Sequence, residues 1–383
     1  MSRARPGTFS EWWWTTDRVA LVAILALFAI GLVLAFAASP AATGGPMTEG
    51  DFRYAAKQIA FAAIAIVILA ATSVMQPRAI KITAATIWII ALTLSLTTLF
   101  AGSEVLGAKR WLNLGWLTLQ PSEFLKPGFA VLAAAILADN RRFVMPKSLL
   151  TLLLLSPAIV ILVLQPDVGQ TALLLALWAT LLFFNGISVR WMGVLAGSGA
   201  ALGGIAYLLI AHVRHRVDQF FDPQEGGYQS GTALKAFARG GLSGVGPGAG
   251  TVKYHLPTAH SDFIFAVAGE EFGVVFCGLI VLLFCVLSAR VLLRSARQSD
   301  AFGALAGAGL ASVVALQAFI NMGVAVSLLP TKGMTLPFIS YGGSSLFAIA
   351  LTMGFALAVT RQRSRIGEAD FDLFAFLREP GPA

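Results

Sequence analysis

Continuous apolar runs of about 20 residues recur along the whole chain, and this repetition constrains the fold more than any other feature. Each run is long enough to cross a hydrocarbon core of ~30 Å as a helix. The runs lack the period-2 alternation of a membrane barrel, and a backbone in lipid must satisfy its own hydrogen bonds, so helices are predicted. The chain is therefore predicted to be an all-α polytopic membrane protein with about ten transmembrane helices, at 18–39, 54–75, 79–100, 122–139, 148–165, 168–187, 191–211, 263–289, 302–328 and 337–360.

The distribution of positive charge predicts how these helices are oriented. An even number of spans places both termini on one side, and the connections on that side carry 16 of the 27 Lys and Arg residues. Cytoplasmic loops carry such an excess, so both termini are predicted to be cytoplasmic, and the long loop 212–262 between the seventh and eighth spans is predicted to lie outside. The net charge of +8 follows from this topology and gives no indication of a nucleic-acid partner.

A single membrane domain is expected at 18–365, between a cytoplasmic N-terminal segment at 1–17 and a cytoplasmic tail at 366–383. The N-terminal segment contains Trp12-Trp13-Trp14, a pattern typical of an interfacial anchor. A loop as long as 212–262 is usually functional or disordered. Its own apolar residues predict that it packs on the outer face, with a short helix near 229–239.

Asp262 ends this long loop and directly precedes the apolar run that begins at Phe263. An acid at the mouth of a membrane helix is costly unless it has partners or a function. Two more acids, Glu270 and Glu271, follow in the same run. Glu270 lies about 12 Å further along a helix, too far for the close carboxylate pair of a retaining glycosidase. The two glutamates are interpreted as buried hydrogen-bonding groups that hold helices together.

Three other charged residues are expected on the outer side. Glu123 and Lys126 are three residues apart, which places them on one helix face. They form either a simple intrahelical pair or part of the layer that contains Asp262, where Lys126 is a candidate partner for the Asp262 carboxylate. Asp167 follows Gln165-Pro166, and it either caps the next helix or lines the site.

Other patterns in the sequence favour a structural interpretation over a ligand or metal site. The glycine-rich stretch 240–250 lacks the Lys-Ser or Lys-Thr of a phosphate loop. The histidines, His212, His215, His255 and His260, lack the spacing and the cysteines of a zinc site, although His260 is close enough to Asp262 in the chain to hydrogen-bond within its site. Asp370 and Asp372 fall in the cytoplasmic tail and read as solvated residues. Cys277 and Cys285 share one predicted helix, cannot pair and read as packing residues.

Four motifs together resemble those of the SEDS family, in order and spacing, over about 18–365. They are Gly107-Ala108-Lys109-Arg110-Trp111 with Leu119-Gln120-Pro121-Ser122-Glu123-Phe124-Leu125-Lys126; Gln165-Pro166-Asp167-Val168-Gly169; Leu256-Pro257-Thr258-Ala259-His260-Ser261-Asp262-Phe263 with Gly269-Glu270-Glu271-Phe272-Gly273; and Leu329-Pro330-Thr331-Lys332-Gly333-Met334-Thr335-Leu336-Pro337 with Ser340-Tyr341-Gly342-Gly343-Ser344-Ser345. Thr331-Lys332-Gly333-Met334-Thr335 is similar to the cell-division (FtsW) branch more than to the elongation (RodA) branch. Thr258 and the stretch 230–233 depart from the family pattern.

The resemblance implies a glycosyltransferase that polymerises lipid II into β-1,4 glycan strands on the outer face of the bacterial cytoplasmic membrane, during division at the septum. It implies that Asp262 is the general base of an inverting displacement. The leaving diphosphate needs positive charge, for which Arg110, Lys126, Arg216 and Lys253 are candidates. The expected substrate-binding residues are Gln120, Glu123 and His260 together with these four cations. No protein metal site is predicted, and a divalent cation, Mg²⁺ or Mn²⁺, is left open as the only cofactor.

The partners that the resemblance implies are lipid II, a class B penicillin-binding protein transpeptidase of the FtsI type, other membrane proteins of the divisome and membrane lipid, without nucleic acid. The transpeptidase's membrane helix is expected to dock on the eighth and ninth spans. Two other classes stay open. A lipid flippase or secondary transporter would carry ionisable residues near the bilayer midplane and inverted repeats, and neither is evident. A scaffold protein would leave Asp262 dispensable.

Overall fold

The computed structural model describes residues 8–43, 53–105, 108–115, 118–141, 143–209, 211, 214, 218, 227–330 and 333–361. Each of the ten predicted spans contains one helix. These are α2 (Arg18–Thr43), α3 (Arg53–Ser73), α4 (Pro77–Ala101), α5 (Ser122–Ala138), α6 (Lys147–Leu164), α7 (Val168–Phe184), α8 (Val189–Leu209), α11 (Ile264–Ala296), α12 (Ala301–Ala325) and α13 (Gly343–Val359). The short α1 (Thr8–Thr15) precedes them.

Seven of these helices are long and apolar enough to cross a membrane, and α7 and α13 are shorter apolar helices of 17 residues each. The predicted fold class, an all-α polytopic membrane protein, is confirmed, while the number of spans and their orientation stay predictions. Two boundaries were wrong by more than five residues: α11 ends at Ala296 rather than at 289, and α13 begins at Gly343 rather than at 337. Pro337 and the left-handed backbone of Phe338 (φ +63°) keep 337–342 in a turn.

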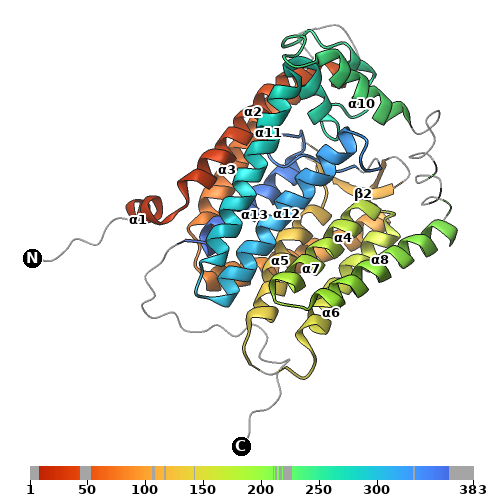
Figure 1. Cartoon of the computed structure of the whole chain (residues 1–383). Helices are drawn as coiled ribbons and strands as arrows, with labels where there is room; N and C mark the ends of the chain where they lie inside the picture. Colours follow the sequence, from red (N-terminus) through yellow and green to blue (C-terminus); the bar gives the residue numbers. More distant parts are fainter. Residues whose placement is uncertain are drawn as a thin grey trace, which may run out of the picture.

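Three helices form the centre of the bundle. Every residue of α13 is buried, as are nearly all of α5 and most of α12, which fits helices that are apolar on all sides. Figure 1 shows α12 and α13 in the middle, with α2, α3 and α11 on one side and α4, α6 and α7 on the other. By contrast, α8 packs mainly against α7 and exposes most of its described side chains, as a lipid-facing helix does.

A small antiparallel sheet precedes α5, which the sequence analysis did not predict. Its strands are β1 (Ser103–Val105), β2 (Ala108–Asn113) and β3 (Thr118–Leu119), in the order β1-β2-β3. The strands are two to six residues long, too short for a clear alternating pattern. The sheet packs against α4 and carries Arg110 toward the start of α7.

The part of the long loop that is described packs onto α11. The helix predicted near 229–239 is confirmed as α10 (Gly227–Gly240), which lies at one end of the molecule beside the start of α11 (Figure 1). A Cβ at Gly240 would be 1.9 Å from the carbonyl of Gly269, so this crossing requires glycine. Gly273 breaks the regular helix of α11 with a φ of +82°, where a Cβ would meet the backbone of Leu242 at 2.3 Å.

Candidate active site

Asp262 lies in a tight turn at the start of α11. The turn is closed by the Asp262 N–H, which donates to the Thr258 carbonyl at 3.1 Å. The Thr258 hydroxyl donates to the Asp262 carboxylate at 3.3 Å, and Thr258 itself has a left-handed backbone (φ +54°). The carboxyl is half-buried. Desolvation raises the pKa of Asp262 to about 6, against the lowering effect of hydrogen bonds from Thr258 and Ser261.

The turn is held by Asn321 of α12 and by the segment that follows α12 in the sequence. The amide of Asn321 donates to the carbonyl of Asp262 at 2.9 Å and to that of Met334 at 2.6 Å. The Ser340 hydroxyl donates to the Ser261 carbonyl at 2.5 Å. These bonds join two sequence motifs into one surface. Thr331 and Lys332, in the same segment, lie outside the described residues.

His260 belongs to the same turn but its ring is in an aromatic cluster. The ring centroid lies 5.0 Å from that of Tyr54 and 5.5 Å from that of Tyr341. The His260 carbonyl accepts a hydrogen bond from the Tyr341 N–H at 2.9 Å. Burial lowers the pKa of His260, so the neutral imidazole predominates at neutral pH. The structure therefore places His260 in the same turn as Asp262, with its imidazole packed against Tyr54 and Tyr341.

Lys126 is the centre of a buried polar chain between α5, α7 and α12. Its ammonium donates to Glu123 and to Gln317, both at 2.7 Å. Glu123 also accepts from the Gln170 amide at 2.5 Å. The Lys126 and Glu123 side chains are 1% and 3% exposed, so each charge depends on the other. The intrahelical pair is confirmed, whereas the expectation that Lys126 pairs with Asp262 at rest is wrong, because Glu123 and Gln317 hold it.

Arg110 and Asp167 extend this chain toward the small sheet. Their side chains form an ion pair at 3.7 Å, and Arg110 donates to the carbonyls of Gln165 (3.1 Å) and Pro166 (2.5 Å). Asp167 also caps α7 by accepting from the Gln170 N–H at 3.2 Å. Burial raises the pKa of Asp167, although Arg110 opposes this shift. The capping interpretation of Asp167 is therefore confirmed, and the interpretation that it lines the site stays a prediction. We name the whole set, Arg110, Asp167, Gln170, Glu123, Lys126 and Gln317, the Lys126 chain.

Gln120 lies at the start of α5 and is buried. Its carbonyl accepts from the Glu123 N–H at 3.3 Å, so it supports the first turn of α5. Arg216 lies outside the described residues, as do His212, His215, Asp370 and Asp372.

Lys253 is not brought to Asp262. Its ammonium is buried, donates to the carbonyl of Ala37 at 2.7 Å and pairs with Glu271. Glu270 accepts from the backbone N–H groups of 251, 252 and 253, at 2.7 to 2.9 Å. The two glutamates are buried hydrogen-bonding groups as predicted. They hold the loop onto α11, and Glu270 also pairs with Arg239 of α10 at 3.7 Å, so it joins two helices. The loop is held there because its backbone N–H groups need acceptors and lie beside the Glu270 carboxylate.

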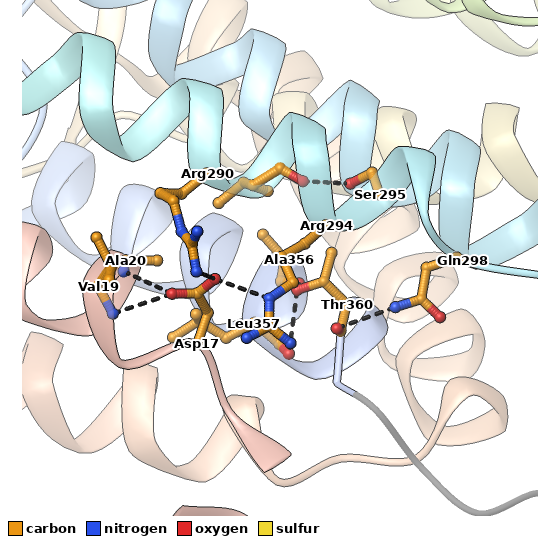
Figure 2. Close-up of polar contacts among 11 residues, drawn as sticks. Asp17, Val19, Ala20, Arg290, Arg294, Ser295, Gln298, Ala356, Leu357 and Thr360 are labelled. Atoms are coloured by element: carbon orange, nitrogen blue, oxygen red, sulfur yellow. Dashed lines mark hydrogen bonds and ion pairs between the residues drawn. The ribbon is translucent and has the colours of Figure 1, made fainter. Parts of the chain in front are cut away.

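A second ionic cluster lies at the opposite end of α11, and the sequence analysis missed it. Figure 2 shows Asp17 between Arg290 and Arg294, each of which donates to its carboxylate at 2.9 Å. Asp17 also caps α2 by accepting from the Val19 and Ala20 N–H groups. Burial alone would raise the pKa of Asp17, but the Ala20 N–H and the two guanidinium groups together lower it. An acid directly before an apolar run is a capping signal that sequence reading offers. We call these three residues the Asp17 cluster.

Two buried amides, Gln317 and Asn321, were also missed. Both are 1% exposed and both lie on α12 inside an apolar run. Polar residues inside a predicted span are the signal that could have found them. Their partners are set by tertiary packing and are not visible in the sequence.

The described residues contain no group of three or more His, Cys, Asp or Glu side chains arranged to hold a metal ion.

Comparison with known proteins fits this architecture. A family profile described as "Cell cycle protein", which covers FtsW, RodA and SpoVE, matches residues 18–365. The chain is 40% identical over 354 residues to the probable peptidoglycan glycosyltransferase FtsW of Caulobacter vibrioides (92% of this chain, 91% of the relative), and 36% identical to that of Alkalilimnicola ehrlichii (91% and 90%).

Solved structures give the same result. A chain from a structure of a peptidoglycan synthase complex that coordinates polymerization and crosslinking has a TM-score of 0.77 at 27% identity, covering 91% of this chain and 98% of that one. The rod shape determining protein RodA of Thermus thermophilus has a TM-score of 0.67 at 26% identity, covering 91% and 97%. The resemblance carried by the sequence motifs is confirmed, and this chain belongs to the family of FtsW, RodA and SpoVE.

Proposed function

We propose that this protein is a cell-division peptidoglycan glycosyltransferase and that Asp262 is its general base. The activity and the division branch rest on relatives named peptidoglycan glycosyltransferase FtsW, of which this chain covers about nine tenths. The assignment of Asp262 rests on one observation: a half-buried carboxylate, on a turn fixed by backbone hydrogen bonds, whose pKa is raised to about 6. A general base works best with a pKa near the operating pH.

The proposed step is a single displacement on lipid II. The 4-hydroxyl oxygen of the acceptor sugar forms a bond to the anomeric carbon of the donor, and its proton passes to the Asp262 carboxylate. The bond from that carbon to the undecaprenyl diphosphate breaks, and the diphosphate leaves with the electron pair. One displacement inverts the α-linked donor to a β-linked product, so no second carboxylate is needed as a nucleophile.

Positive charge near the leaving diphosphate supports this step. We assign this function to Lys126 and Arg110 among the described residues, and to Arg216 from the long loop. Lys126 has three N–H donors, of which Glu123 and Gln317 occupy two. Lys253 is omitted because Glu271 and the Ala37 carbonyl hold its ammonium between the loop, α11 and α2, whereas Lys126 is linked through Gln317 to the segment beside the Asp262 turn. A Mg²⁺ or Mn²⁺ ion bound with the diphosphate would supply further positive charge.

We infer that the protein works with a crosslinking partner in the cytoplasmic membrane at the division septum. The similar chain in a peptidoglycan synthase complex supports this inference. The partner would be a class B penicillin-binding protein transpeptidase, which uses new glycan strands as its substrate for crosslinking. Other membrane proteins of the divisome would recruit the pair.

The decisive test is polymerisation of labelled lipid II by the full chain, purified with its transpeptidase. Asp262→Asn should abolish glycan formation, because the amide cannot accept the proton, while the protein still folds. Asp17→Asn is the matched control: it makes the same acid-to-amide change at the other end of α11, retains a good helix cap and should keep activity.

Two results would count against the proposal. Normal glycan strands from the Asp262→Asn variant would remove the assignment of the base. Movement of lipid II across vesicles without any glycan product, from the unaltered protein, would instead favour a flippase.

A further inference from the structure

Two carboxamide side chains on α12, Gln317 and Asn321, connect the two charged groups of the proposed reaction. They are four residues apart, which places them on one face of the helix. Gln317 contacts the Lys126 ammonium, and Asn321 contacts the backbone of Asp262. We name them the α12 amide pair.

Gln317 uses both ends of its amide. Its oxygen accepts from Lys126 at 2.7 Å, and its nitrogen donates to the carbonyl and hydroxyl of Thr335, at 3.1 and 3.3 Å. An amide can accept from an ammonium on one side and donate to a carbonyl on the other, which an ionised carboxylate of the same length cannot do. Gln317 therefore fixes the distance between Lys126 and the segment after α12.

Asn321 joins that same segment to the turn of the base. Its nitrogen donates to the Asp262 carbonyl at 2.9 Å and to the Met334 carbonyl at 2.6 Å. Both N–H donors of the amide are thus in use. Asn321 contacts the main chain of Asp262. It therefore affects the position of the carboxyl group without contacting that group.

We propose that the α12 amide pair are positioning residues, which hold the Lys126 ammonium and the Asp262 turn in one fixed arrangement on a shared helix. This inference rests on the proposed function. Misplacing a reacting group by about 1 Å can reduce a rate on the order of 100-fold. A buried helix that contacts both groups is a rigid support for such an arrangement.

The surroundings of Asp262 make the pH profile informative. The groups that face its carboxyl from its own turn are the hydroxyls of Thr258 and Ser261, with His260 as the titratable neighbour in the turn. From the segment after α12, Gly333 is close enough that a Cβ there would lie 3.7 Å from the carboxylate oxygen. On α12, Asn321 is uncharged. No ion pair to Asp262 is present among the described residues.

The test measures kcat, KM and the pH dependence of lipid II polymerisation by the full chain with its transpeptidase. Asn321→Ala should lower kcat on the order of 100-fold. In the pH–rate profile of this variant, the fall in activity on the acid side should move to lower pH. The reason is that the turn, once it has lost its bond to Asn321, exposes the Asp262 carboxyl to water, which lowers its pKa. Gln317→Glu should raise KM roughly tenfold or more, because the new carboxylate competes with the diphosphate for Lys126. If this variant does not fold, Gln317→Met keeps the length and removes both hydrogen bonds.

Ser312→Ala is the matched control. Ser312 is buried on the same helix and donates only to the Ala308 carbonyl, one turn back, so its loss should leave kcat, KM and the pH profile unchanged. The inference is overturned if the amide variants behave like Ser312→Ala. It is also overturned if they lose activity only in proportion to lost folded protein, with the acid limb unmoved. If the unaltered protein makes no glycan, the proposed function fails instead.

Discussion

The Asp17 cluster at one end of α11 and the Lys126 chain between α5, α7 and α12 differ in burial and in connectivity. The Asp17 cluster pairs one carboxylate with two guanidinium groups that are 37% and 22% exposed. The Lys126 chain, near the Asp262 end, contains a lysine and a glutamate that are almost fully buried and bridged by amides from two other helices. Exposed ion pairs contribute little and are screened, whereas a buried pair is costly to break.

The difference suggests two purposes. The Asp17 cluster caps α2 and fixes the end of α11 with groups that water also solvates. Joining two helix ends in this way has a small desolvation cost. The Lys126 chain places charge where charge is expensive, beside the turn of Asp262. Buried ionisable residues within membrane helices are a functional hypothesis by default. Variants in both groups test this contrast.

The largest expected effect is at Lys126. Lys126→Ala should reduce polymerisation on the order of 100-fold or more, as loss of a preorganised electrostatic contact does. It should also destabilise the protein by about 3–5 kcal/mol, because Glu123 is left buried and unpaired. Activity on lipid II and thermal unfolding in detergent measure the two effects.

A paired change separates those effects. Lys126→Met with Glu123→Gln removes both charges and should regain most of the stability without regaining activity. Recovery of activity in the double variant would mean that the Lys126 chain is structural, and the contrast between the two groups would fail.

The pH dependence of polymerisation comes next in size. Asp262 must be deprotonated to accept a proton, so activity should fall below its pKa of about 6, roughly tenfold per pH unit. A rate measured from pH 4.5 to 8 checks this. His260→Gln should retain the acid limb; its disappearance in that variant would assign the limb to the imidazole.

A smaller effect is expected at the Asp17 cluster. Asp17→Ala should cost about 2 kcal/mol of stability, from a lost helix cap and a partly screened ion pair, with activity retained at temperatures where the variant is folded. The pKa of Asp17 is lowered in the folded state, so its contribution is present above the ordinary aspartate pKa and is lost as pH falls through the lowered value. The stability difference between variant and parent should therefore shrink in acid. Loss of polymerisation at full folding would instead link this end of α11 to the site.

The smallest effect is expected at Trp12, whose indole N–H donates to the Ser73 hydroxyl at 2.9 Å. Trp12→Phe should lower stability by about 1 kcal/mol, the usual value of one hydrogen bond, and should leave activity unchanged. A shift in the unfolding midpoint comparable to that of Asp17→Ala would show that α1 anchors the bundle more strongly than its contacts indicate.

The sequence was most informative where a property depends on neighbouring residues. The positions of the ten predicted spans, the short helix α10 and the i, i+3 pair of Glu123 and Lys126 all follow from local periodicity. Partners at long range were not accessible in this way. Glu271 pairs with Lys253, and Lys253 also reaches Ala37 on α2, because the loop folds back over α11. No spacing in the chain encodes that contact.

Hydropathy alone determined that this chain is a polytopic helical membrane protein, since a backbone in lipid has few other ways to satisfy its hydrogen bonds. Four motifs spread over residues 18–365 together indicated its family, and the family profile matches the same range. The tertiary structure alone decided what surrounds the carboxylate. It placed Lys126 with Glu123 and Gln317 rather than with Asp262, and it placed Asn321 on the carbonyl of Asp262. A buried polar group takes the partner that packing brings within hydrogen-bond distance, and packing depends on helices far apart in the sequence.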